Sequence, residues 1–125
     1  MKKNKQLSIW MDYSNALLME LYNHKIISRR IAVKPPEKNK IKVDTPEVTI
    51  LTKEQKNKQL KYFKEISDIV INYQEVLLFG PTEAKNDLLA LLKEDYHYKN
   101  IIFELMNTNK MKEAKIHDFV IEHFN

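Results

Sequence analysis

Apolar and polar residues alternate along the first part of the chain. Within residues 7–12, Leu7, Ile9 and Met11 fall on one side and the residues between them on the other. A period of two is typical of a β-strand. Two further strands are predicted at residues 16–22 and 26–33, with turn residues at 13–15 and 23–24. Because such short connections join antiparallel strands, the pattern predicts a three-stranded meander.

The next segment breaks this pattern. Residues 34–47 contain three prolines and four lysines, a composition typical of a loop. Residues 48–51 are an apolar tetrad that fits a short strand, and we refer to residues 34–51 as the basic loop. Thr52 and Gln55 then have the spacing of a capping box, which predicts a helix over residues 52–71.

Helical spacing returns in that predicted helix. Its first half is rich in lysine, and its apolar residues recur at intervals of three and four. We therefore expect the apolar positions to face the core. They are Leu60, Phe63, Ile66, Ile69, Val70 and Tyr73.

The last part of the chain alternates strands and helices. Residues 75–79 and 100–106 are continuous apolar runs, which favour strands buried on both faces. Between them, residues 81–93 predict a helix whose leucines pack inward. These are Leu88, Leu89, Leu91 and Leu92. Thr108 or Asn109 is expected to cap a final helix that ends near Phe124.

The predicted order is therefore β-β-β-α-β-α-β-α. Strands joined through helices pair in parallel by right-handed crossovers. The resulting fold class is α/β, with a mixed five-stranded sheet and helices on its faces. This order is shared with ribonuclease H-like folds. The length of 125 residues suits one domain, spanning residues 1–125.

The amino-acid composition bears on membrane association and on the cellular compartment of the protein. No apolar run is long enough to cross a membrane, so no membrane partner is expected. The chain has no cysteine, which excludes disulfides, thiolate metal sites and a cysteine nucleophile. These features predict a cytoplasmic protein.

Charge is distributed unevenly. From residue 29 to residue 64 there are eleven Lys and Arg against four acids, a net charge of +7. From residue 65 onward there are six against eleven, a net charge of −5. The basic part is either an ordinary solvated surface or a surface that faces phosphates.

The only glycine stands between a predicted strand and a predicted helix. Gly80 is expected to cap that helix, with Pro81 at its first position and Glu83 at its third. Pro81 removes a backbone N–H and Glu83 brings negative charge, whereas Lys85 offsets part of that charge. The missing N–H and the added negative charge both disfavour phosphate binding. We therefore predict a structural turn, with no bound cofactor.

Catalytic residue patterns are weak. Asp12 ends the first strand, where ribonuclease H-like nucleases place a metal-binding acid, but the strand at 75–79 has no acid at its C-terminal end. Asp12 is instead expected to accept backbone N–H bonds in the hairpin. The four histidines show no metal-ligand spacing. We expect no metal site and no enzymatic activity, with a metal-dependent nuclease as the least favoured alternative.

Three segments suggest a family. Residues 76–88 resemble the strand–GPxEAK–helix segment of small bacterial relatives of the archaeo-eukaryotic peptide-chain release factors. Residues 9–16 resemble the WIDxxxA hairpin start of the same group, and residues 111–124 are similar to its closing helix. The resemblance implies a fold like the middle domain of the release factors and of Pelota-type rescue factors.

The same resemblance exposes a difference. In release factors, a Gly-Gly-Gln loop before the long helix promotes peptidyl-tRNA hydrolysis. The corresponding residues 34–52 contain neither glycine nor glutamine. Peptide release by that mechanism is therefore not implied for this chain.

Two functions remain open besides the nuclease. The first is a translation-associated, non-catalytic module that binds ribosomal RNA or tRNA through the basic loop and the following helix. Its phosphate contacts would be Lys34, Lys38, Lys40, Lys42, Lys56, Lys58 and Lys61. The second is a protein-interaction domain without nucleic acid, which forms a homodimer through an edge strand at residues 26–33.

Overall fold

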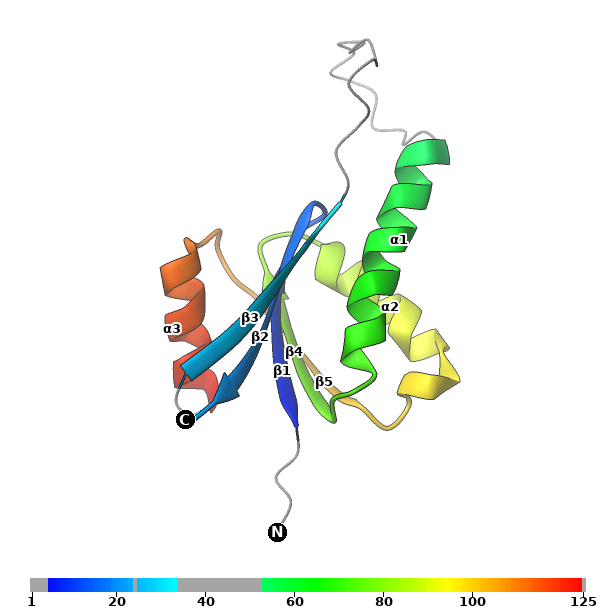
Figure 1. Ribbon diagram of the computed structural model, residues 1–125. Helices are drawn as coiled ribbons and strands as arrows, with labels where there is room; N and C mark the ends of the chain where they lie inside the picture. The colour runs from blue at the N-terminus through cyan, green and yellow to red at the C-terminus, as the bar shows by residue number, and fades with distance from the viewer. Residues whose placement is uncertain (1–4, 24, 34–52, 125) are drawn as a thin grey trace, which may run out of the picture.

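A computed structural model describes residues 5–23, 25–33 and 53–124. Its elements have the order that the sequence predicts (Figure 1). The strands are β1 (Gln6–Met11), β2 (Asn15–Tyr22), β3 (Lys25–Ala32), β4 (Glu75–Gly80) and β5 (Ile102–Asn107). The helices are α1 (Lys53–Val70), α2 (Ala84–Glu94), the short 3₁₀-helix η1 (Tyr96–Tyr98) and α3 (Glu113–Phe124). The basic loop and Thr52 lie outside the described residues.

The five strands form one mixed sheet in the order β3-β2-β1-β4-β5. The β1·β2 and β2·β3 pairs are antiparallel, which confirms the predicted meander. The β1·β4 and β4·β5 pairs are parallel, as expected for strands joined through helices. The sheet confirms the predicted α/β class and is consistent with a ribonuclease H-like fold.

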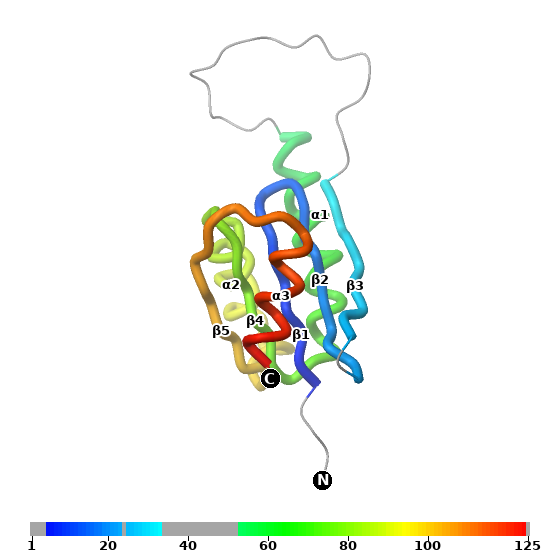
Figure 2. The backbone as a smooth tube through the Cα atoms, turned by 90° about the vertical axis from the view of Figure 1, so that its left-hand side faces the viewer, coloured from blue at the N-terminus to red at the C-terminus, as the bar shows by residue number. Residues whose placement is uncertain are grey.

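Helices cover both faces of the sheet. In Figure 1, α1 and α2 lie on one side and α3 on the other, and the turned view in Figure 2 shows α3 in front of the strands. Each face has its own apolar cluster. Ile9 and Leu78 lie in the cluster under α1 and α2, whereas Trp10 and Phe79 lie in the cluster under α3. The alternation in β1 and β4 therefore supplies two layers of core.

The first hairpin confirms the structural role predicted for Asp12. Its Oδ1 accepts hydrogen bonds from the backbone N–H groups of Ser14 and Asn15, each at 2.7 Å. The backbone N–H of Asp12 in turn donates to the Asn15 carbonyl oxygen at 2.9 Å. These bonds close the turn between β1 and β2 and fix their register.

The predicted burial of the last strand is wrong. β5 lies at the edge of the sheet, and its Ile102 is 63% exposed. An apolar run does not distinguish an inner strand from an edge strand, because that difference depends on whether a further strand pairs with its outer side. The final helix also begins later than expected, at Glu113, where the Ile116 N–H bonds the Lys112 carbonyl.

Two leucines predicted to face the core are also exposed. Leu60 on α1 is 55% exposed and Leu91 on α2 is 44% exposed, whereas Leu88 and Leu92 are buried. Helical spacing places Leu60 and Leu91 close to the apolar stripe, but each lies at its border. β3 forms the other edge of the sheet. Pairing of two copies through β3 stays a prediction.

Candidate nucleic-acid interface

Two of the lysines predicted to contact phosphate lie together. Lys58 and Lys61 are one turn apart on α1 and line a small hollow beside the end of β3. Its other lining residues are Ala32, Val33, Tyr62 and Glu65. The hollow has a volume of about 20 Å³, which is room for roughly one water molecule. It is therefore a shallow surface depression with two lysines at its border, and it is too small to hold a nucleotide.

Tyr62 fixes this part of α1 against the first hairpin. Its hydroxyl donates to the backbone oxygen of Asp12 at 2.9 Å, and its side chain is buried. Burial, and secondarily the charge of Asp12, raises the pKa of Tyr62 far above its usual range. The tyrosine therefore remains protonated and keeps donating, so Lys58 and Lys61 project from a rigid part of the helix.

Acidic residues offset part of the local charge. Glu54 lies 3.5 Å from the Lys58 ammonium, and Glu65 lines the same hollow. Arg29 adds positive charge that sequence reasoning did not single out. In the antiparallel β2·β3 register, Arg29 lies opposite Leu18, and opposite residues point to the same face of the sheet. Because the Leu18 side chain lies in the core under α1, Arg29 is on the α1 face. Because side chains two apart in a strand share a face, a strand at residues 26–33 places Arg29 on the same face as Ile31, which is buried in that core.

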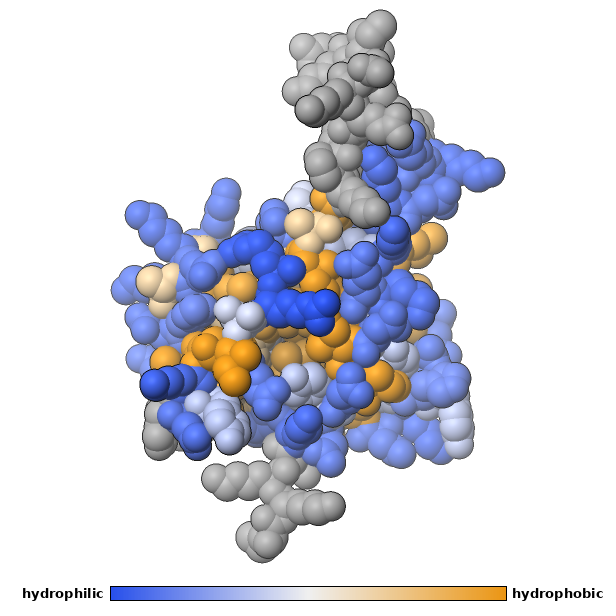
Figure 3. Space-filling view, in the orientation of Figure 1, coloured by the Kyte–Doolittle hydropathy of each residue, from blue (hydrophilic) through white to orange (hydrophobic). Residues whose placement is uncertain are grey.

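Lys56 does not join this pair. At about 100° per residue, Lys56 lies roughly 200° around the axis of α1 from Lys58. The lysines of α1 are thus divided between two sides of the helix. Lys34, Lys38, Lys40 and Lys42 lie outside the described residues. Hydrophilic side chains cover the upper part of α1 in Figure 3, and hydrophobic ones show between α1 and β3.

The glycine turn differs from its predicted form. Gly80 is the last residue of β4, not a helix cap, and Glu83 occupies the N-cap of α2. Pro81 therefore precedes the helix by three residues, and the first turn forms when Asn86 and Asp87 donate to the Glu83 carbonyl. Pro81 and Thr82 extend the connection, which is why the helix starts later.

Gly80 is required by its surroundings. Its φ is +146°, a conformation that side chains rarely allow, and an added Cβ would lie 2.3 Å from the backbone oxygen of Met11. The missing side chain therefore lets β4 approach β1. This geometry gives Gly80 a structural role, and the absence of phosphate binding stays a prediction.

Lys85 is buried in the first turn of α2, although a surface position would be typical of a lysine. Its ammonium donates to the Thr82 backbone oxygen at 2.6 Å. Nearby, the Tyr13 hydroxyl donates to Asp87 at 2.7 Å, and this bond together with burial raises the pKa of Tyr13 to about 12. These contacts tie the β1–β2 hairpin and the glycine turn to α2.

Metal chemistry finds no support among residues 5–23, 25–33 and 53–124. No three side chains of His, Cys, Asp or Glu gather there in a way that would hold a metal ion. In the same described part of the chain, no helix is long and apolar enough to cross a membrane.

Comparison with known proteins identifies the fold. No protein-family model matches the sequence, and no curated protein matches it. Among solved structures, Pelota from Thermoplasma acidophilum is similar, with 14% identity and a TM-score of 0.59 over 94% of this chain. Pelota from Archaeoglobus fulgidus has 13% identity and a TM-score of 0.55 over 98%.

An archaeal translation termination factor, aRF1, is similar to the same degree. It has 13% identity and a TM-score of 0.54 over 95% of this chain. This chain covers 32% of the first Pelota structure, 35% of the second and 34% of aRF1, which is about a third of each. At such low identity the likeness concerns the fold, and it agrees with the fold implied by the release-factor resemblance.

Proposed function

We propose that this chain is a translation-associated module that binds ribosomal RNA or tRNA without catalysing a reaction. Its fold is that of a segment of Pelota and of aRF1, the latter a translation termination factor. This shared fold is the observation that carries the proposal. Residues 34–52 lack the glycines and glutamine of the peptide-release loop, so binding is proposed without hydrolysis.

The proposed contacts are made by the basic part of the chain. Lys58 and Lys61 present two ammonium groups beside β3, and Arg29 extends the charge along the same face of the sheet. The four lysines of the basic loop come directly after β3 in sequence and would add to this surface. Lysine contacts to phosphates give affinity without sequence readout. The expected ligand is thus recognised by its backbone and shape.

Binding that depends on phosphate contacts weakens steeply as salt rises. We would measure the anisotropy of labelled tRNA, and separately of a ribosomal RNA fragment, over a salt series. Lys58→Gln/Lys61→Gln should weaken binding and lower the slope of log affinity against log salt by roughly 1 to 2. The matched control is Lys112→Gln/Lys115→Gln, which removes two charges on the α3 side of the sheet.

Two results would reject the proposal. One is an RNA affinity that stays constant between low and physiological salt. The other is an equal loss of affinity in both double variants, since that would indicate a response to net charge alone. Recovery of ribosomes from lysate with the parent protein, lost after RNase treatment, would support the translation setting independently.

A further inference from the structure

A second surface lies on the side of α1 that faces α2. A groove of about 340 Å³ runs between the two helices. Phe63, Leu92 and Tyr98 are buried at its base, and Leu60 and Leu91 stand on its two walls. The groove therefore has an apolar floor and an exposed leucine on each wall.

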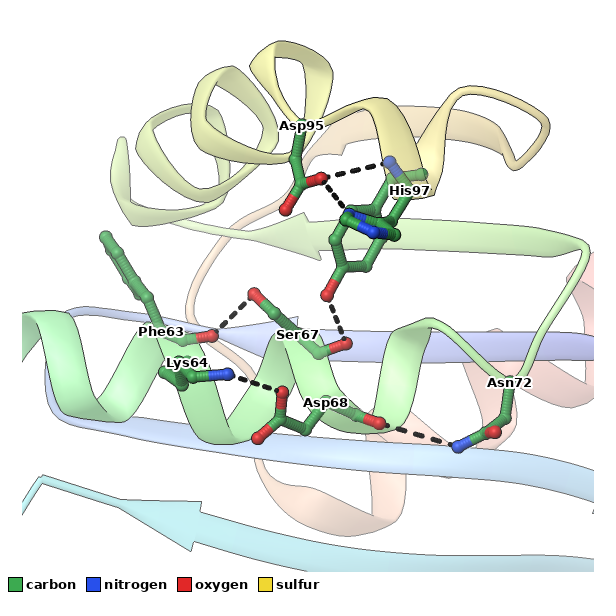
Figure 4. A network of polar contacts seen from close by, with 8 residues as sticks. Phe63, Lys64, Ser67, Asp68, Asn72, Asp95 and His97 are labelled. Atoms are coloured by element: carbon green, nitrogen blue, oxygen red, sulfur yellow. Dashed lines mark hydrogen bonds and ion pairs between the residues drawn. The ribbon is translucent and has the colours of Figure 1, made fainter.

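The polar contacts in Figure 4 keep the groove walls in place. The Tyr98 hydroxyl donates to the Ser67 backbone oxygen at 3.0 Å and so joins η1 to α1. The Asp95 carboxylate accepts a hydrogen bond from the backbone N–H of His97 at 2.9 Å. The walls are therefore held by the fold itself, and a partner meets a preformed surface.

The two walls repeat the same pattern with opposite charge. On α1, Leu60 is followed one turn later by Lys64, and at the end of α2, Leu91 is followed one turn later by Asp95. Each helix leads into one strand of the parallel β4·β5 pair, and in Figure 1 both descend from the upper end of the sheet toward the lower end, at an angle to each other. The order of leucine and charge along the groove is thus the same on both walls.

This pattern is complementary to itself. A rotation of 180° about an axis along the groove exchanges the walls of two facing copies. Leu60 of one copy then meets Leu91 of the other, and Lys64 meets Asp95. Each of these two contacts occurs twice in the dimer. Such an isologous contact packs leucine on leucine and pairs an ammonium with a carboxylate.

We infer that the α1–α2 groove is a homodimer interface, occupied by the same groove of a second copy of this chain. The Lys64 ammonium, which bonds Asp68 at 3.0 Å, stays solvent-exposed and can also face the partner's carboxylate. Lys58 and Lys61 line the hollow beside β3 and do not line this groove. The dimer therefore leaves the proposed RNA surface open, and the two inferences are independent.

The interface can be tested with two exposed substitutions. Leu60→Lys and Leu91→Glu each introduce a good helix former at the groove rim, so the fold is expected to persist, as circular dichroism would verify. Sedimentation velocity should show a reversible dimer of the parent protein. Each variant alone should raise the dissociation constant at least about tenfold, because each places a charge opposite leucine at both contacts.

Mixing the two variants gives the sharpest test. In the mixed dimer, the introduced lysine meets the introduced glutamate at one contact, and the native leucines meet at the other. Association should therefore return toward the parental level in the mixture. Ile27→Lys on the exposed edge strand β3 is the matched control and should leave dimerisation unchanged.

Several outcomes would overturn the inference. They are a parent protein that sediments as a monomer at every concentration, a dimer that survives Leu60→Lys and Leu91→Glu, or a mixture that stays monomeric. Loss of the dimer in Ile27→Lys alone would instead assign the contact to β3. If either charged variant fails to fold, Leu60→Gln and Leu91→Gln apply the same test to the parent interface with less perturbation.

Discussion

The hydroxyl of Tyr62 donates to the backbone oxygen of Asp12 across 2.9 Å, which joins the middle of α1 to the turn after β1. Asp12 meanwhile uses its side chain to close that turn. One residue therefore serves both the hairpin and the docking of the long helix. Disturbing this contact is expected to affect the positions of Lys58 and Lys61 as well as stability.

Tyr62→Phe removes the hydroxyl and leaves the buried ring in place. The Asp12 carbonyl then loses a partner, so the free energy of unfolding should fall by about 1 to 2 kcal/mol. Urea denaturation followed by circular dichroism measures this change. Tyr22→Phe, at an exposed position of β2, should have almost no effect. Equal stability of Tyr62→Phe and the parent protein would contradict the structural role given to this bond.

Ionisation of Tyr73 is expected to lower the free energy of unfolding at alkaline pH. Burial, and next its 2.6 Å hydrogen bond to Glu20, raises the pKa of Tyr73 from 10.0 to about 12. The unfolded chain therefore loses this proton first, so the stabilisation is complete below pH 10.0 and is lost as the pH rises to about 12. Tyr73→Phe should flatten this decline in a series of urea titrations. An unchanged decline would show that the proton lost belongs to other groups.

Gly80→Ala tests the close approach of β4 to β1. The new Cβ would lie 2.3 Å from the Met11 oxygen in a backbone conformation that alanine avoids, so the free energy of unfolding should fall by at least about 2 kcal/mol. Pro81→Ala, one residue later, should cost no more than about 1 kcal/mol. Thermal unfolding of both variants checks the prediction, and similar melting temperatures would contradict it.

The sequence allowed the sheet to be predicted because its signals are local. Alternation identified the first strand of the meander, and the short turns at 13–15 and 23–24 required antiparallel pairing of the three strands. The parallel pairing of the remaining strands was predicted from the helices that connect them. The release-factor resemblance pointed to the same fold.

Features that depend on neighbours distant in sequence were harder to predict. β5 has an apolar sequence, yet it lies at an edge of the sheet and its Ile102 is exposed. Leu60 and Leu91 match a helical stripe but face each other across an open groove. The start of α2 depended on the Glu83 carbonyl, and Lys85 had no local signal for burial.

The arrangement of β1 also has a kinetic consequence. Its register places Gln6 opposite Glu75, so the centre of the sheet closes only when residues far apart along the chain meet. The loop entropy of that closure grows slowly, as the logarithm of the intervening length. Insertions between β3 and α1 are therefore expected to change the folding barrier more than the final stability.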